Sequence, residues 1–206
     1  MYARSTTVQG DPQNIEAGID YVRRHVMPAI QQMDGCIGLS MLCDRESGRC
    51  IITSAWRDEA AMHDTEGAVY DLRKTAAEML GGSPEVQEWE IALMHRMHEA
   101  HNGACTRVIW ASGDPARVQD NVDSFRMGML PKIEELPGFC SLSLMLDRDN
   151  GRWATAVTYD SRHDMDVASE QAAALRNEFV RSVGMEITDI DEFELVVAHL
   201  RVPEMV

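Results

Sequence analysis

Apolar residues recur every three or four positions in two segments of the first half of the chain. Ile15, Ile19, Val22, Val26, Ile30 and Met33 mark one such stripe, and Met62, Val69, Leu72, Ala76 and Leu80 mark a second. This spacing is typical of helices with one buried face. Shorter runs rich in β-branched and apolar residues predict strands over 3–9, 37–43, 50–56 and 86–95. The first half therefore predicts the order β-α-β-β-α-β, which is the ferredoxin-like arrangement.

The same pattern returns in the second half, so the chain is a tandem duplication. Gly10-Asp11-Pro12 returns as Gly113-Asp114-Pro115, an offset of 103 residues (113 − 10), and the offset becomes 104 by the last strand, where His95 matches His199 (199 − 95). In the second half we expect strands over 106–111, 140–146, 153–159 and 190–199. We predict a first repeat over 1–97, a linker over 98–105 and a second repeat over 106–206.

The two predicted hairpins indicate how the repeats assemble. A tight turn at Gly48 places Cys43 opposite Cys50 and Ile37 opposite Trp56, and the equivalent register places Cys140 opposite Tyr159. One face of each sheet is then apolar, while the other carries small residues that need a second sheet as cover. The predicted fold is α+β, with two ferredoxin-like repeats packed sheet to sheet as a pseudo-dimeric α/β barrel.

Charge and composition narrow the range of partners. The 206 residues contain 19 Lys and Arg against 34 Asp and Glu, a net charge of −15. This sign disfavours nucleic acid and anionic membranes as partners. No apolar stretch approaches the roughly 20 residues of a membrane span, and five cysteines without disulfide spacing indicate reduced thiols. We expect a cytoplasmic protein, present as a pseudo-dimeric monomer or as a homodimer.

The segment in which the third strand enters the second helix carries a family resemblance. Ser54-Ala55-Trp56-Arg57-Asp58-Glu59-Ala60-Ala61-Met62-His63, and more weakly Thr158-Tyr159-Asp160-Ser161-Arg162-His163-Asp164-Met165, resemble the antibiotic-biosynthesis-monooxygenase domain of the dimeric α/β-barrel superfamily. The resemblance covers nearly the whole chain as two fused copies. It implies oxygenation of a small aromatic or apolar molecule without a metal or flavin cofactor.

Heme is the cofactor of one branch of that superfamily, and the sequence disfavours it here. The heme-degrading branch uses an Asn on the first strand, a Trp in the second helix and a His about ten residues later. The first strand of this chain has no Asn. The other two positions fall near Thr65 and Thr75 in the first repeat, and on Ala168 and Glu178 in the second.

Five residues are candidates for a site. Trp56 and Tyr159 lie at equivalent strand ends, where an aromatic ring can stack on a flat ligand, and His25 borders the first helical stripe. His95 and His199 are equivalent strand-end histidines that can act as base or ligand. The alternative for the aromatic residues is core packing, and for the histidines a structural hydrogen bond.

Other reactive side chains have simpler interpretations. His95, His98 and His101 are spaced three residues apart, which predicts incidental metal affinity rather than a dedicated metal site. Cys43 and Cys50 replace Leu146 and Trp153 of the other repeat, which indicates an apolar pair. We therefore expect no metal and no cysteine nucleophile.

The resulting hypothesis is a monooxygenase-like protein that binds a small aromatic or apolar molecule in a cleft between sheet and helices. Two alternatives stay open. One is a protein that binds heme or a hydrophobic ligand without catalysis, and the other is a non-catalytic interaction or assembly protein. A ligand titration separates them, because only the last binds no small molecule.

Overall fold

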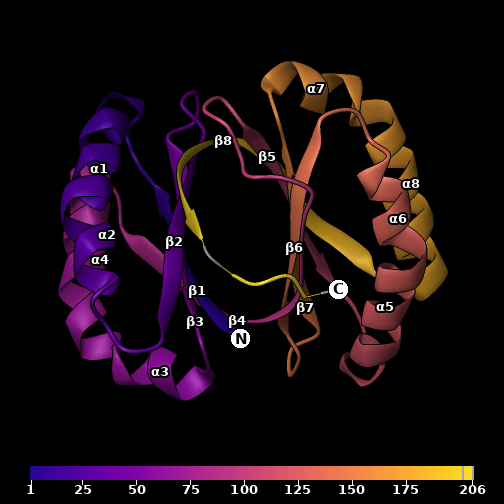
Figure 1. The fold of residues 1–206 in the computed structure, drawn as a ribbon, viewed down its shortest axis with the longest axis horizontal. Helices are drawn as coiled ribbons and strands as arrows, with labels where there is room; N and C mark the ends of the chain where they lie inside the picture. Colours follow the sequence, from indigo (N-terminus) through magenta and orange to yellow (C-terminus); the bar gives the residue numbers. More distant parts are fainter. Residues whose placement is uncertain (201, 206) are drawn as a thin grey trace. The chain divides into compact units, whose positions relative to one another are not determined.

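The α+β fold with two ferredoxin-like repeats is confirmed by a computed structural model that describes residues 1–200 and 202–205. The chain divides into two compact units. The first unit contains Met1–Trp89 and Phe193–Val202, and the second contains Glu90–Glu192 and Pro203–Val206. Each unit has helices on one face of an antiparallel sheet (Figure 1).

The first repeat follows the predicted order of elements. Its helices and strands are β1 (Tyr2–Gln9), α1 (Ile15–Tyr21), α2 (Met27–Ile30), β2 (Cys36–Cys43), β3 (Arg49–Trp56), α3 (Glu59–Asp64), α4 (Glu66–Leu80) and β4 (Pro84–Arg96). The predicted second helix is divided into α3 and α4 at Thr65. Asp58 begins α3 as an N-cap, since its carboxylate accepts a hydrogen bond of 2.8 Å from the amide of Ala61.

The second repeat has the same order. Its elements are β5 (Cys105–Ser112), α5 (Val118–Ser124), α6 (Leu130–Glu134), β6 (Phe139–Asp147), β7 (Arg152–Tyr159), α7 (Arg162–Val167), α8 (Ser169–Val183) and β8 (Glu186–Leu200). Short 3-10 turns precede the first helix of each repeat, at Pro12–Asn14 and Pro115–Arg117. Asp11 and Asp114 cap these turns, as the Gly-Asp-Pro motifs predict.

The sheets combine strands from both repeats. In the first unit the hydrogen-bonded order is β1-β3-β2-β8, and in the second it is β5-β7-β6-β4. The strand at the end of each repeat therefore pairs with the hairpin of the other repeat: β8 pairs with β2, and Glu90–Arg96 of β4 pairs with β6. Strands of 13 and 15 residues are long enough for this, because a typical strand has five or six.

The hairpin registers agree with the prediction except at one end. Cys43 pairs with Cys50 and Leu146 with Trp153, as expected. At the far end of each hairpin, Cys36 and not Ile37 pairs with Trp56, and Phe139 and not Cys140 pairs with Tyr159. Both differences arise from a register shift between the first strand positions, a β-bulge that adds one residue to a strand.

The first helix of each repeat contains an unexpected π-helical turn, at Val22–Val26 and at Phe125–Met129. A proline follows closely in both cases, Pro28 and Pro131. Proline has no amide hydrogen and its ring clashes with the carbonyl one turn earlier, so the wider π turn accommodates it. The apolar stripe therefore continues through the turn, with Phe125 and Met129 directed at the sheet of the second unit.

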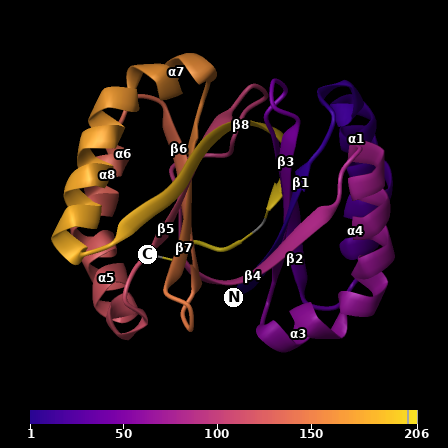
Figure 2. The ribbon, with the colours of Figure 1, turned by 180° about the vertical axis from the view of Figure 1, so that it is seen from behind.

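In each unit the helices cover one face of the sheet (Figure 2), and buried apolar side chains form a core of that unit. In the first unit Ile15, Met41 and Leu80 are completely or almost completely buried. In the second unit Leu142, Leu144 and Met165 are completely buried. No helix formed by the described residues is long and apolar enough to cross a membrane.

Candidate functional site

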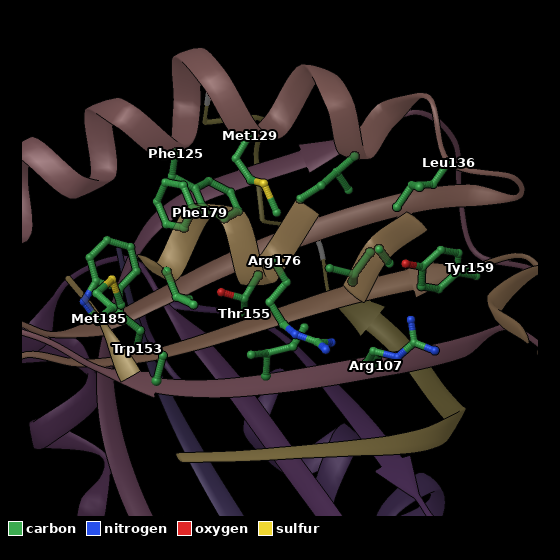
Figure 3. Close-up of a pocket in the computed structure, with 16 residues that line it drawn as sticks. Arg107, Phe125, Met129, Leu136, Trp153, Thr155, Tyr159, Arg176, Phe179 and Met185 are labelled. Atoms are coloured by element: carbon green, nitrogen blue, oxygen red, sulfur yellow. The ribbon is translucent and has the colours of Figure 1, made fainter. Parts of the chain in front are cut away.

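A pocket opens in the second unit, between the sheet strands β5 and β7 and the helical segments α5–α6 and α8 (Figure 3). Its cavity volume is about 60 Å³, within a wider region of about 650 Å³ that includes open solvent. Most of the lining is apolar, and its larger members are Phe125, Met129, Leu136, Trp153, Phe179 and Met185. A largely apolar hollow with a few polar groups is the usual form of a small-molecule site.

The aromatic side chains gather at one end of this pocket. Phe125 and Phe179 pack edge to face, with ring centroids 5.4 Å apart and planes at 88°. Trp153 and Met185 lie at the same end (Figure 3). This end offers flat, polarisable surfaces against which an aromatic ligand can stack.

The other end of the pocket is polar. Arg107 comes from β5, Tyr159 from the end of β7, and Arg176 from the middle of α8 (Figure 3). The Arg107 guanidinium lies 5.9 Å from the centroid of the Tyr159 ring, a cation–π distance. Two positive charges and a phenol therefore face one end of an otherwise apolar hollow.

Arg107 is held by one carboxylate. Its Nε and Nη2 atoms donate hydrogen bonds of 2.9 and 2.7 Å to Oε1 of Glu192, although Arg107 itself is only 4% exposed. Nη2 also lies 3.4 Å from Oγ of Ser169. Among the described residues, the buried Nη1 of Arg107 and Nε of Arg176 have no hydrogen-bond partner.

Burial shifts the pKa values of two of these groups. The pKa of Tyr159 is raised mainly by burial, against the lowering effect of the Arg107 charge, so the phenol stays protonated at neutral pH and can donate a hydrogen bond. The pKa of Arg176 is lowered by burial and then by repulsion from Arg107. Arg176 nevertheless remains a cation at neutral pH, because a guanidinium group is not deprotonated in proteins.

The equivalent place in the first unit holds a balanced set of charges. Arg4 and Arg73 correspond to Arg107 and Arg176 at the offset of 103 residues (107 − 4; 176 − 73). Glu88 accepts hydrogen bonds of 3.0 and 2.7 Å from Arg4. Glu66 lies 3.0 Å from Nη1 of Arg4 and accepts hydrogen bonds from Arg73. Both arginines therefore have carboxylate partners.

The packing of the long helix differs between the two units. Val69, Ala76, Ala77 and Leu80 of α4 are all buried, whereas in α8, which the structure describes throughout, Val183 alone is buried. In the first unit Gly18 allows close approach of α1 and α4, because a Cβ there would lie 2.3 Å from Cδ2 of Leu80. The second repeat has Asn121 at this position, so α8 cannot pack against α5 in the same way.

The two predicted aromatic ligand residues occupy different environments. Tyr159 lines the pocket of the second unit. Trp56 belongs to the core of the first unit, where it is fully buried and its Nε1 donates a hydrogen bond of 3.0 Å to Oγ of Ser54. His25 is exposed and stacks on Tyr21 with ring centroids 5.1 Å apart.

The two predicted catalytic histidines lie on strands outside the pocket lining. Nε2 of His95 is 3.0 Å from Oε1 of Glu134, its Nδ1 contacts Glu204, and its ring stacks on Phe139 at 6.1 Å. His199 pairs with Leu39 in the ladder between β8 and β2. The structure thus gives His95 a pair of carboxylate partners and does not bring it to the pocket.

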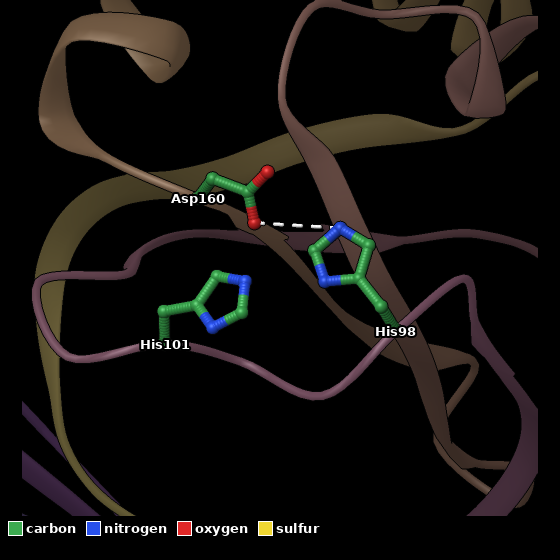
Figure 4. A group of neighbouring side chains, drawn as sticks. All are labelled: His98, His101 and Asp160. Carbon is green, nitrogen blue, oxygen red and sulfur yellow. Dashed lines mark ion pairs between the residues drawn. The ribbon is translucent and has the colours of Figure 1, made fainter.

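Two linker histidines meet a carboxylate at the surface. His98, His101 and Asp160 place potential metal-ligand atoms within 4.8 Å of one another, and Nε2 of His98 is 3.4 Å from Oδ1 of Asp160 (Figure 4). His95 is not part of this group. The rings of His98 and His101 stack with centroids 5.5 Å apart, which also accounts for their proximity without an ion.

Arg107 and Arg176 are the site residues that sequence analysis missed. Both belong to the repeat pattern, since arginines stand at the same places in the first repeat. The sequence does contain one indication, a difference in charge between the repeats. The first repeat has Glu66 where the second has Ser169, whereas Glu88 and Glu192 are both acidic. Comparing charges between repeats, position by position, would have pointed to this end of the pocket.

Comparisons with known protein sequences found one matching family model and a relative along the whole chain. The family model for "Antibiotic biosynthesis monooxygenase" matches residues 1–68. The chain is 49% identical over 206 residues to the uncharacterized protein Rv2557 of Mycobacterium tuberculosis, covering all of this chain and 92% of that one. This is a match along both repeats.

Two solved structures have the same fold. A candidate monooxygenase from Lactobacillus acidophilus superposes with a TM-score of 0.71 at 13% identity, covering 97% of this chain and 96% of that chain. An anthrone oxidase-like protein superposes with a TM-score of 0.68 at 13% identity, covering 95% of this chain and 91% of that one. At this level of identity the similarity concerns the fold.

Proposed function

We propose, for a chain that belongs to the antibiotic biosynthesis monooxygenase family, that the second unit binds a small aromatic or apolar molecule in the pocket between its sheet and helices. One observation carries this proposal: the second unit has an apolar pocket with aromatic walls, while the equivalent residues of the first unit are closely packed. The first unit then has a structural role and binds no ligand.

Oxygenation of the bound molecule is the reaction that the family and the anthrone oxidase-like neighbour suggest. In such a reaction the protein holds an electron-rich phenol or enol in its ionised form against O2. The residues at the polar end fit this task, since Arg107 and Arg176 stabilise negative charge and Tyr159 donates a hydrogen bond. His95 and His199 stay our predicted catalytic residues from the sequence, but neither lines this pocket, so a role as base requires a ligand bound beside them.

Binding without catalysis is the second candidate. Of the described residues that line the pocket, none is a histidine, an aspartate or a glutamate. Removal of a proton from a neutral substrate needs a base within hydrogen-bond reach or one water away. A pocket lined in this way favours a ligand that arrives already ionised.

A pocket-filling substitution tests the proposal. Ala172 lines the pocket, and Ala174 is a residue on the same helix outside the pocket lining, so Ala172→Leu and Ala174→Leu form a matched pair. We expect a member of a panel of phenols, anthrones, quinols and heme to raise the thermal midpoint of the wild type and of Ala174→Leu, but not of Ala172→Leu. Oxygen uptake with the same ligand then separates catalysis from binding.

The proposal fails if no member of the panel shifts the midpoint of the folded wild type. It also fails if Ala172→Leu, folded by circular dichroism, responds as the wild type does. The first result favours an interaction or assembly role for the chain. The second shows that the ligand binds elsewhere.

A further inference from the structure

The polar end of the pocket carries more positive charge than its carboxylates neutralise. Arg107 and Arg176 face this end, and Glu192 is the carboxylate that Arg107 contacts. Arg162, half exposed at the surface, takes the other oxygen of Glu192 at 2.6 Å. Among the described residues, Arg176 has no ion-pair partner. At least one positive charge is therefore uncompensated.

In the first unit the charges of the two equivalent arginines are neutralised. There Glu66 binds both arginines, lying 3.0 Å from Arg4 and accepting hydrogen bonds from Arg73. In the second unit Ser169 replaces this glutamate and offers a neutral hydroxyl 3.4 Å from Arg107. A single exchange between the repeats, Glu66 to Ser169, leaves the buried Arg107 and the partly buried Arg176 without the second carboxylate.

Two unsatisfied donors belong to side chains that line the pocket. Nη1 of Arg107 and Nε of Arg176 are buried without a hydrogen-bond partner in the part of the chain that the structure describes. Both side chains line the pocket, and Arg107 is more than nine-tenths buried. Figure 3 shows both guanidinium groups at the base of the pocket, with Arg176 between the aromatic end and Tyr159. A buried donor without a partner is unfavourable, so an acceptor placed here is bound strongly.

We propose that this pocket selects aromatic or apolar molecules bearing one carboxylate, and that Arg107 and Arg176 bind the carboxylate in the place that Glu66 occupies in the first unit. A planar guanidinium matches the two oxygens of a carboxylate. Arg107 and Arg176 carry two positive charges and Glu192 carries one negative charge, so one further negative charge, on the ligand, makes this group neutral. The ring of the ligand lies toward Trp153 and Phe179, and Tyr159 donates a hydrogen bond. The inference rests on the proposed function of the pocket as a ligand site.

A pair of probes with the same ring tests the charge preference. 2-Naphthoate and 2-naphthamide have nearly the same shape, but only the first is an anion. We expect the wild-type chain to bind naphthoate about tenfold or more tightly than naphthamide, measured by calorimetry and by quenching of tryptophan fluorescence. Trp153→Phe abolishes most of the fluorescence change, because the ring of the ligand lies toward Trp153.

The variant Ser169→Glu gives the second unit the carboxylate that Glu66 provides in the first unit. The new carboxylate occupies the ligand's place on the two arginines, so the preference for naphthoate over naphthamide falls to about one. Ser169→Ala is the matched control and keeps the preference, since it adds no charge. Arg176→Gln weakens naphthoate binding about tenfold while naphthamide binding stays within a few-fold. Thermal melting of each variant shows that it is folded.

Different results contradict the carboxylate preference and the ligand pocket itself. Equal affinity of the wild type for the two probes, or an undiminished preference in Ser169→Glu, contradicts the carboxylate inference and leaves the pocket as a ligand site. Failure of both probes and of every member of the wider panel to bind contradicts the proposed function together with the inference. Tight naphthoate binding that survives both Ser169→Glu and Ala172→Leu shows that the anion binds outside the pocket and also overturns the inference.

Discussion

Ser169 Oγ lies 3.4 Å from Nη2 of Arg107, in the place where the first unit sets Oε2 of Glu66 3.0 Å from Nη1 of Arg4. The two repeats agree in their arginines and differ in this partner. The difference coincides with the opening of a pocket in the second unit. Duplication thus provides an internal reference: one copy shows the arginines with two carboxylates, and the other shows them with one.

Removing the second arginine should have opposite effects on the stability of the two units. Arg176→Met replaces a partly buried side chain whose Nε has no hydrogen-bond partner among the described residues, so we expect it to stabilise the ligand-free chain by about 1 kcal/mol. Arg73→Met removes a partner of Glu66, so we expect it to destabilise by about 1–3 kcal/mol. Denaturant unfolding of the two variants measures both effects. Destabilisation of equal size by both would contradict the charge comparison.

Glu66 should stabilise the chain in a pH-dependent way. Hydrogen bonds from Arg73 lower the pKa of Glu66 in the folded chain, so its contribution is complete above the ordinary glutamate pKa of about 4.3 and is lost as the pH falls through the lower folded value. We expect Glu66→Gln to reduce the free energy of unfolding by about 1 kcal/mol at pH 7, since the side chain is partly exposed, and by progressively less below pH 4.

The control for this experiment is Glu78→Gln, a change at an exposed glutamate whose contact with Lys74 is 4.0 Å. It should alter stability by a few tenths of a kcal/mol at any pH. A pH-independent difference between Glu66→Gln and the wild type would show that the ion pairs of Glu66 are not its stabilising interaction.

Gly18 should be intolerant of any side chain. A Cβ at this position would lie 2.3 Å from Cδ2 of Leu80, a side chain that is itself fully buried. We expect Gly18→Ala to destabilise the chain by about 1–3 kcal/mol, because α1 and α4 must move apart. Gly67 in α4 is the matched control: nothing lies within 4 Å of the position that a Cβ would take there, so Gly67→Ala should stabilise by about 0.5–1 kcal/mol. Equal effects of the two changes would disprove the packing argument.

The cysteine pair of the first hairpin should be chemically inert in the folded chain. Cys43 and Cys50 are buried with sulfur atoms 2.7 Å apart, and their hydrogen bond together with burial raises the pKa of Cys43. A thiol reagent at pH 8 should label Cys36, which is partly exposed, and should reach all five cysteines only after denaturation. Mass spectrometry of the labelled peptides identifies the sites, and rapid native labelling of Cys43 would contradict the prediction.

Local patterns were sufficient to predict most of the fold. The helical stripes, the Gly-Asp-Pro caps and the hairpin turns each act over a few residues, so the sequence alone indicates them. The register shifts at Cys36 and Phe139 and the π turns before Pro28 and Pro131 were missed, because each depends on how a strand end or a proline is accommodated by its neighbours.

The site was harder to predict because it depends on pairings between distant residues. Tyr159 was a candidate on the sequence, since an aromatic residue at a strand end is visible in the pattern. Arg107 and Arg176 are 69 positions apart (176 − 107), and their meaning depends on the absence of one carboxylate at Ser169. Only a folded structure brings these three residues together.

Hydrogen exchange in the presence of a ligand shows which of the two units binds it. With 2-naphthoate or the best member of the ligand panel at saturation, we predict slower amide exchange in peptides from α8 and from Phe125–Met129, which border the pocket. Peptides from α4 and Val22–Val26 should be unaffected, and calorimetry should give one ligand per chain. Protection confined to the first unit, or equal protection in both with two ligands per chain, would contradict a single site in the second unit.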